Sequence, residues 1–297
     1  APIELKVFSH KHLIIMTEGA SPKGLSAKLD KKRKRQAEES AQQNKPQAAP
    51  ATAPAASADG PNKKKRKKGK KNKQQPEQDV KSQDRKSGVD ESIGKMDGRL
   101  LADYFAQRAQ KLDKELSAVE LSDLSIPDSA FLDTSSFTEP RSLDKLPDFL
   151  KAFSPKGADL SKASETKGSP HTLVVSSAGL RAADVVRALR TFQNKESIVG
   201  KLFAKHIKLE EAKQFLERAR TGMGAGTPAR ISDLIESGTL KVDELERIVI
   251  DGSHIDQKQR GIFDMKETHF PLLQLLARPE LRERYGTKKN RVQILVF

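Results

Sequence analysis

The 297-residue chain contains no cysteine and no tryptophan, and only 5% of its residues are aromatic. The absence of cysteine excludes a disulfide framework, a Cys-ligated zinc or iron-sulfur site and a cysteine nucleophile. The sequence therefore does not fit a small secreted disulfide-rich protein or a zinc finger, and it suits a reducing compartment.

Long apolar runs are also missing. The longest aliphatic stretch near the start, Leu13 to Met16, is far shorter than the ~20 apolar residues that cross a bilayer. We therefore expect no membrane partner. The alternation of Ile3, Leu5 and Val7 at the very start is typical of a short strand, and Met16 is an alternative start of the chain.

Aromatic residues are absent between residues 17 and 98, where Ala, Pro, Gln, Ser and Lys dominate. Burial in such a segment cannot offset the roughly 1–2 kcal/mol of backbone entropy that each ordered residue loses. We therefore expect a mostly disordered arm over 1–98, a helical and extended segment over 99–169, and a folded domain over 170–297.

Positive charge is concentrated in this arm. The formal charge is +15, and residues 1–98 hold 23 Lys and Arg against 12 Asp and Glu. Dense basic blocks on a flexible tether favour a nuclear or nucleolar address and contacts to nucleic-acid phosphates, and the alternative is a solubilising tail. The two blocks comprise Lys31, Lys32, Arg33, Lys34, Arg35, Lys63, Lys64, Lys65, Arg66, Lys67, Lys68, Lys70, Lys71 and Lys73.

The segment after the arm has apolar residues at helical and extended spacings. A spacing of three and four predicts an amphipathic helix over 99–119 with Asp97 as its N-cap. We expect an extended strap over 119–137, and a short helix from Ser142 through Phe153. These pieces either cover the chain's own domain or dock on partner proteins.

Strands and helices alternate over the last 128 residues, which predicts an α/β fold with one parallel sheet and helices on both faces. Ligands of such sheets lie at the carboxyl ends of the strands. The expected strands are 172–176, 198–204, 222–226, 246–250 and 292–296, and the expected helices are 180–192, 208–219, 228–237 and 265–276.

Catalytic and metal-binding motifs are missing. The sequence has no Gly-x-Ser-x-Gly, no His-Glu-x-x-His and no Gly-x-x-x-x-Gly-Lys-Ser/Thr, and its six histidines do not cluster with carboxylates. We therefore expect no enzyme activity, no cofactor and no metal. A nucleotide or S-adenosylmethionine loop over 222–226, used together with Asp251, is the enzymatic alternative.

Three segments resemble the first RecA-like domain of DEAD-box RNA helicases. Gly226-Thr227-Pro228-Ala229-Arg230 is similar to motif Ib, Ile248 to His254 lies where motif II should be, and Thr172 to Ala182 occupies the place of motif Ia. In motif II, Asp251 matches the metal-binding carboxylate, but Gly252 stands where the family has its catalytic Glu. The resemblance therefore implies a degenerate RecA-like domain without helicase activity, in which Asp251 is structural.

The combination of segments resembles the CMS family of small-subunit pre-ribosome assembly factors. It consists of the basic arm, Leu101 to Phe105, Leu124 to Asp128, Leu202 to Lys208 and Gly226 to Pro228. The resemblance implies a nucleolar, non-enzymatic component of the 90S pre-ribosome, or small-subunit processome, that binds pre-ribosomal RNA or assembly proteins in a large ribonucleoprotein.

The candidate RNA-binding residues follow from the same resemblance. Thr227 and Arg230 lie in the motif Ib segment, and a helix cap and a solvated cation are their structural alternatives. The full set is Ser176, Ser177, Arg181, Lys205, His206, Lys208, Thr227 and Arg230. A chromatin or DNA-replication adaptor remains an alternative function, because the arm alone does not distinguish RNA from DNA.

Overall fold

The computed structural model of the chain describes residues 85–86 and 88–297. The two basic blocks and the alternating residues at the start lie outside the described residues.

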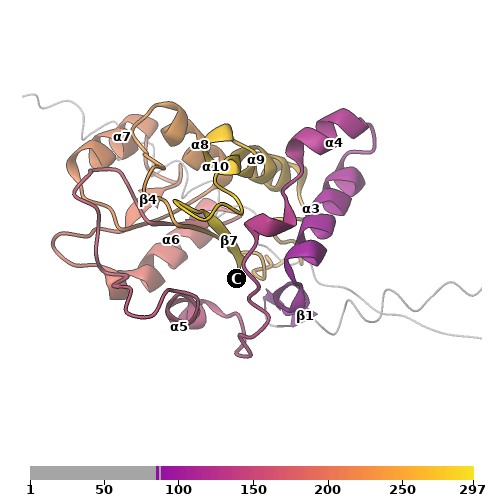
Figure 1. Cartoon of the computed structure of the whole chain (residues 1–297), viewed down its shortest axis with the longest axis horizontal. Coiled ribbons are helices and arrows are strands. Elements are labelled where there is room, and N and C mark those ends of the chain that lie inside the picture. The colour runs from indigo at the N-terminus through magenta and orange to yellow at the C-terminus, as the bar shows by residue number, and fades with distance from the viewer. Residues whose placement is uncertain (1–84, 87) are drawn as a thin grey trace, which may run out of the picture. The chain divides into compact units, whose positions relative to one another are not determined.

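A parallel sheet of five strands forms the centre of the described part (Figure 1). The strand order is β4-β5-β3-β6-β7, and each neighbouring pair is parallel. The α/β class and the five strands predicted from the sequence are confirmed, although the second strand is shorter than expected. The bounds are β3 Thr172–Val175, β4 Gly200–Leu202, β5 Met223–Gly226, β6 Arg247–Ile250 and β7 Gln293–Val296.

The four helices expected between these strands are also present, each within a few residues of its expected bounds. They are α6 Gly179–Leu189, α7 Leu209–Arg218, α8 Pro228–Glu236 and α9 Lys266–Leu276. A 3₁₀ turn, Arg190–Phe192, extends α6, and the short helix α10, Pro279–Arg282, was not expected.

Alternate residues of the strands pack into two separate cores, as the two-residue period of a strand requires. Leu173 and Val175 of β3 join the core that α7, α8 and α9 cover, whereas Val174 joins the core under α6. Helices therefore cover both faces of the sheet, and Figure 1 shows α7, α8 and α9 on the opposite side from α5 and α6.

The amphipathic helix before the domain is shorter than the expected 99–119. Helix α3, Gly98–Leu112, begins after its N-cap Asp97, whose carboxylate accepts a hydrogen bond from the Leu100 amide at 2.9 Å. A second helix, α4 Ala118–Leu124, then starts where the strap was expected. Ser117 and Glu120 form a capping box there, and this pattern was readable in the sequence.

The rest of the expected strap is extended apart from the 3₁₀ turn Asp128–Ala130. The Leu132 amide donates to the Ile294 carbonyl of β7 at 2.8 Å, and Phe131 forms a parallel bridge with Ile294. The strap therefore covers the β7 edge of the sheet. It is followed by the 3₁₀ turn Leu143–Lys145 and helix α5, Leu146–Ala152, which has Pro147 in its first turn, as expected.

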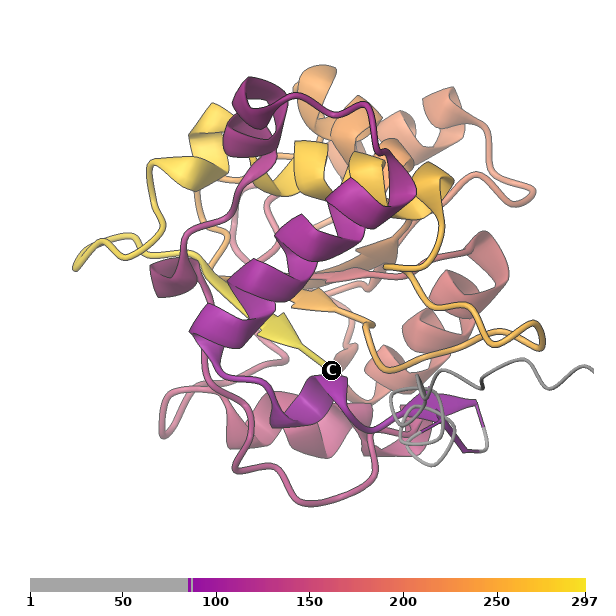
Figure 2. The ribbon, with the colours of Figure 1, turned by 90° about the vertical axis from the view of Figure 1, so that its right-hand side faces the viewer.

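The segment 99–169 covers the chain's own domain. Leu101 and Phe105 of α3 and Phe149 of α5 are each at most 1% exposed. Figure 2 shows α3 crossing in front of β7. The apolar faces of α3 and α5 are thus filled by the domain itself.

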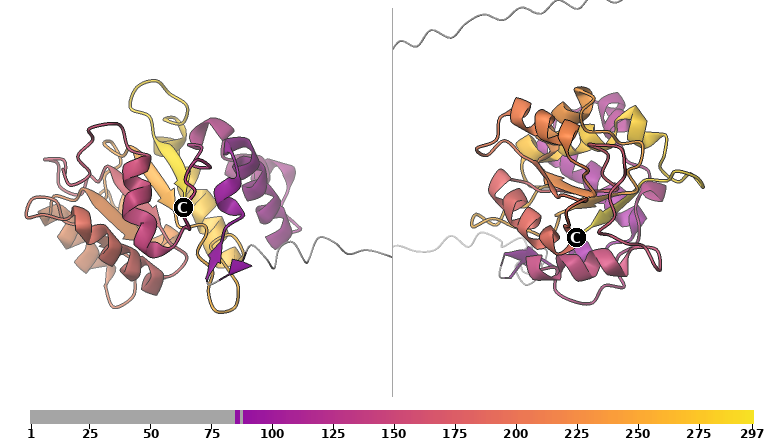
Figure 3. Two further views of the ribbon diagram at one scale, coloured as in Figure 1. Left: turned by 90° about the horizontal axis from the view of Figure 1, so that it is seen from below. Right: turned by 90° about the vertical axis from the view of Figure 1, so that its left-hand side faces the viewer.

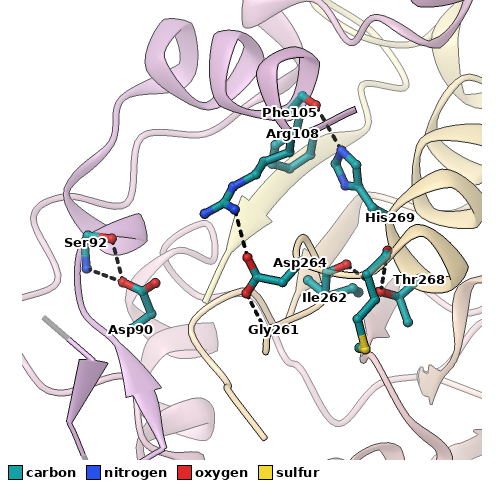
Figure 4. Close-up of polar contacts among 10 residues, drawn as sticks. Asp90, Ser92, Phe105, Arg108, Gly261, Ile262, Asp264, Thr268 and His269 are labelled. Carbon is teal, nitrogen blue, oxygen red and sulfur yellow. Dashed lines mark hydrogen bonds and ion pairs between the residues drawn. The ribbon is translucent and has the colours of Figure 1, made fainter. Parts of the chain in front are cut away.

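Two polar contacts fix α3 against α9 and the segment that leads into it (Figure 4). The Arg108 guanidinium lies 2.9 Å from the Asp264 carboxylate. The buried His269 ring bonds the Phe105 carbonyl through Nε2 at 2.9 Å, which makes His269 the donor. The position of α3 is therefore set by charge and hydrogen bonding as well as by its apolar face.

The ordered part begins earlier than the expected boundary at residue 98. Strands β1 Arg85–Lys86 and β2 Val89–Asp90 form an antiparallel hairpin, and the 3₁₀ turn Ile93–Lys95 follows. Ile93 is 2% exposed, and the Asp90 amide donates to the Ser253 carbonyl at 2.7 Å. The absence of aromatic residues had suggested an arm up to 98, but one buried isoleucine and these backbone hydrogen bonds anchor its end.

Candidate functional site

The candidate residues lie where the strands end at their carboxyl sides. Because β3, β4, β5 and β6 are parallel, the residues that follow them meet at one edge of the sheet. Ser176 follows β3, the turn 203–208 follows β4, Thr227 follows β5 and Asp251 follows β6. The structure therefore places these residues at the carboxyl ends of the strands, as the order of strands and helices predicted, and their role in binding stays a prediction.

The half-buried Arg181 and the buried Asp251 form an ion pair at this edge. Arg181, in the first turn of α6, donates from Nε and Nη2 to the two carboxylate oxygens of Asp251 at 2.8 and 2.9 Å. The side chains are 14% and 1% exposed. Burial lowers the pKa of Arg181, but its hydrogen bond to Asp251 and the charge of that carboxylate raise it, and the net shift is upward. Arg181 therefore faces the sheet, and its guanidinium is committed to Asp251.

Gly252 has no room for a side chain. A Cβ at this position would lie 2.7 Å from Val296 Cγ1 and 2.9 Å from an edge carbon of the Phe263 ring. The Gly252 amide donates to the Phe297 carbonyl at 2.8 Å, which holds the backbone in place. Apolar packing therefore leaves no room for a side chain at the position where the helicases have their catalytic glutamate.

Polar groups beside this pair are shielded from solvent. The hydroxyls of Ser176 and Ser253 are buried and have no hydrogen-bond partner within the described part of the chain. His254 forms an antiparallel bridge with Val89 of the hairpin, and burial and the charge of Arg181 lower its pKa. Ser176 therefore does not lie where a ligand in solvent would reach it, whereas its neighbour Ser177 is half-buried.

The glycines 222–226 form a buried strand and not an open loop. A Cβ on Gly226 would lie 1.9 Å from the Leu202 carbonyl oxygen, and one on Gly224 would lie 2.7 Å from Leu202 Cδ1. These glycines let β5 lie close to β4. The alternative of a nucleotide loop over this segment is therefore wrong.

Thr227 and Arg230 mark the start of α8. Thr227 is the N-cap residue, but its side chain makes no capping hydrogen bond, and Pro228 takes the first helical position. The Arg230 guanidinium donates from Nη1 to the Ile207 carbonyl at 3.1 Å and is half-buried. Arg230 thus ties α8 to the turn after β4 and keeps other donors available.

The turn after β4 presents exposed basic side chains. Lys205, His206 and Lys208 are exposed, and His206 has a positive φ of 60° that forms the turn. A Cβ on Gly179, at the start of α6, would lie 3.1 Å from Lys205 Cβ, so this turn lies against the α6 N-terminus. The structure therefore places Lys205 beside the α6 N-terminus and Arg230 beside the turn that carries Lys205, His206 and Lys208, whereas the Arg181 guanidinium is bound to Asp251.

Arg141 is a buried residue that the sequence analysis missed. It is 3% exposed and donates from Nη2 to the Gly94 and Thr134 carbonyls at 2.9 and 2.7 Å, and from Nη1 to the Val296 carbonyl. Burial lowers its pKa to about 10. An arginine between proline and serine usually signals a solvated loop, so no local pattern reveals this position.

No metal site accompanies this edge. Across residues 85–86 and 88–297, no group of three or more His, Cys, Asp or Glu side chains is placed to hold a metal ion. None of the helices in the same part of the chain has the length and apolar content of a membrane span.

The chain matches a known protein family over most of its length. Residues 26–297 match the family model described as "CMS1: U3-containing 90S pre-ribosomal complex subunit". The chain belongs to the CMS1 family. The resemblance to the CMS family is thereby confirmed, and the chain is a subunit of the U3-containing 90S pre-ribosomal complex, which acts in ribosome biogenesis.

Individual CMS1 relatives are similar over most of the folded part. The chain is 51% identical to protein CMS1 of Chaetomium thermophilum over 214 residues, which are 72% of this chain and 85% of that protein. It is 32% identical to human protein CMSS1 over 64% of this chain and 62% of that protein. It is 30% identical to Schizosaccharomyces pombe protein cms1 over 65% of this chain and 68% of that protein. Membership in a 90S pre-ribosome family implies a nucleolar context.

Proposed function

We propose that this CMS1 protein is a non-catalytic, nucleolar subunit that contacts pre-ribosomal RNA and small-subunit assembly proteins. The observation that carries the non-catalytic part is the Asp251 carboxylate, both of whose oxygens accept hydrogen bonds from Arg181. The Asp251 side chain is 1% exposed and its charge is neutralised by Arg181, so a magnesium ion would have to disrupt this pair to reach the carboxylate.

A degenerate RecA-like origin of the domain is supported by three features. The strand that ends at Asp251 lies beside the strand that ends at Ser176, as expected for motifs II and Ia. The strap pairs in parallel with β7 and leads through a loop into α5. Strand, loop and helix follow one another in the same order around a phosphate-binding loop. Arg141 fills that loop with its buried side chain, and Gly252 leaves no space for a catalytic glutamate.

The RNA contact is assigned to an exposed basic patch formed by Lys205, His206, Lys208 and Arg230, which we call the edge patch. Lys205 and Lys208 make no ion pair within the described residues, so both charges face solvent. Side chains of this kind neutralise phosphates and position RNA without reading its sequence. Thr227 and Ser177 add hydroxyls at the border of the same patch.

The RNA part is tested by crosslinking in cells. We expect the full-length chain to crosslink to precursor ribosomal RNA, and a Lys205→Glu/Lys208→Glu/Arg230→Ala variant to lose most of these reads. Lys241→Glu, which changes an exposed lysine after α8, is the matched control. Unchanged reads in the triple variant with intact 90S association would refute the edge patch and leave protein docking as the role of the domain.

The non-catalytic part is tested by calorimetry. We expect no heat of binding when ATP and magnesium are titrated to millimolar concentration into the full chain. Measurable binding that disappears in Asp251→Asn would contradict the proposal, because it would require the carboxylate to hold the metal.

A further inference from the structure

The two edges of the five-stranded sheet differ in what covers them. The β7 edge is closed by the strap, through the Leu132 amide and the Ile294 carbonyl. Strand β4 pairs only with β5 among the described residues, so its outer edge has no neighbouring strand. An uncovered strand edge is a template for pairing with another chain. This side of the molecule faces the viewer in the right-hand view of Figure 3.

A groove runs along this open edge between α6 and α7. It consists of two adjoining hollows of about 350 and 510 Å³, which share Ile198, Glu211 and Phe215 as lining residues. Val186 of α6 and Arg190 of the 3₁₀ turn that extends it line the first hollow on one side of β4, and Ala212 of α7 lines it on the other. The groove therefore lies where the next strand of the sheet would be.

The two walls of the groove differ in chemistry. On the α7 side, the half-buried Phe215 lies next to the core that contains Ala212 and Leu202. On the α6 side, the exposed Arg190 and Lys201 line the groove. Lys201 alternates with Leu202 along β4, which places it on the face of the sheet opposite to α7. The α7 wall is therefore apolar at Phe215 and Ala212 and also carries Glu211 and Arg218. The α6 wall carries the two positive charges of Arg190 and Lys201 beside apolar Val186 and Val199.

Positive charges outnumber negative ones among the residues that line this groove. Arg190, Lys201 and Arg218 line the two hollows and take part in no ion pair within the part of the chain that the structure describes, whereas Glu211 is the one acidic residue among the lining residues. A partner with carboxylates complements this excess of positive charge.

We propose that the groove binds an extended segment of a partner protein, which adds a strand to β4 and alternates apolar with acidic side chains. Successive side chains of a strand point to opposite faces. One row of the partner then packs on Phe215, and the other row pairs with Arg190 and Lys201. Backbone hydrogen bonds to β4 supply affinity, and the two walls supply specificity.

The test uses the full-length chain and a fluorescein-labelled eight-residue peptide that alternates valine and glutamate. A peptide of four valines followed by four glutamates has the same composition and charge, and it controls for attraction to basic segments elsewhere in the chain. We expect the alternating peptide to bind more tightly by about tenfold, because only its pattern matches both walls. Equal binding of the two peptides, or no binding at millimolar concentration, would overturn the proposal.

Two variants locate the binding site. Arg190→Glu reverses an exposed charge of the groove, and Arg187→Glu reverses an exposed charge of the same helix that does not line it. We expect only Arg190→Glu to weaken the alternating peptide, and hydrogen exchange to show new protection over 198–202 when this peptide is bound. Binding that is equally weakened by both variants, or protection elsewhere only, would contradict the assignment.

Discussion

The regions around Arg141 and Arg181 each shield an arginine from much of the solvent, and they compensate its charge in different ways. Arg181 is paired with the carboxylate of Asp251, which lies on the neighbouring strand of the sheet. Arg141 has no carboxylate within hydrogen-bond distance in the described part and donates to carbonyl oxygens instead. The difference shows that one charge is neutralised by a single carboxylate, whereas the other is shared among the carbonyls of three segments.

The consequence for the fold differs between the two regions. The carbonyls bound by Arg141 belong to Gly94, Thr134 and Val296, so one side chain connects the segment before α3, the strap and the end of β7. The Arg181 pair connects only α6 with the end of β6. Removal of each arginine should therefore have effects of different size.

The largest effect is expected for Arg141→Met. The substitution removes the charged donor that the Gly94, Thr134 and Val296 carbonyls share, although the Thr134 carbonyl keeps the Phe137 amide and the Val296 carbonyl keeps the Thr134 hydroxyl as a donor. Hydrogen bonds to a charged group contribute about 1.5–3 kcal/mol each, and loss of the buried charge offsets part of this, so we expect the free energy of unfolding to fall by roughly 4 kcal/mol. Urea unfolding measures this loss. Lys156→Met, an exposed change on the same segment, is the control, and a loss of less than about 1 kcal/mol in Arg141→Met would refute the role of this residue.

A smaller loss is expected for Asp251→Ala. It leaves the Arg181 charge buried without its partner, which typically costs about 3 kcal/mol. The double variant Arg181→Met/Asp251→Ala removes both charges and should be more stable than Asp251→Ala alone. Asp184→Ala breaks the exposed pair with Arg187 and serves as the control, for which we expect no measurable loss.

His269 is a third polar residue that the fold shields from solvent, and unlike Arg141 and Arg181 it carries no charge at neutral pH. Burial lowers its pKa from 6.5 to about 4. Between these values the unfolded chain takes up a proton that the folded chain does not, so stability falls as the pH falls from about 6.5 to about 4, by up to about 3 kcal/mol. Burial lowers the pKa of His171 and His254 as well, which adds to this trend.

The pH prediction is checked by urea unfolding at pH 7 and pH 4.5. His269→Gln keeps a donor for the Phe105 carbonyl and removes the titrating group, so we expect a smaller loss of stability on acidification than in the unchanged chain. The same loss in both proteins would show that other groups dominate.

The smallest effect is expected for Ser117→Ala, which removes an exposed anchor of the helix α4. The Ser117 hydroxyl accepts a hydrogen bond from an amide of the first turn at 3.2 Å. Loss of such a cap costs about 1 kcal/mol, and here it should raise the hydrogen-exchange rates of α4 amides without lowering global stability. Ser122→Ala, on the same helix, is the control. A change in the global unfolding midpoint would contradict the local role.

Sequence patterns predicted strands and helices correctly where the pattern lies within one short segment. The alternation of β-branched runs with helical spacing gave five strands and four helices, and the motif segments pointed to the carboxyl ends of the strands. The pattern was misread over 99–119, where the capping box at Ser117 starts a new helix after α3 has ended at Leu112. The signal was present, but the apolar spacing through Val119 outweighed it in the interpretation, and Val119 proved to be 71% exposed.

The sequence by itself determined the α/β class, the family and the position of the candidate edge, because these follow from residue spacing and motif order along the chain. Only the tertiary structure decided that Arg181 faces Asp251 and that Arg141 is buried among carbonyls. It also decided that the glycines before Thr227 serve strand packing and that the β4 edge is open. Each of these depends on which groups from distant segments meet, and a buried arginine or a close backbone contact leaves no periodic trace in the sequence.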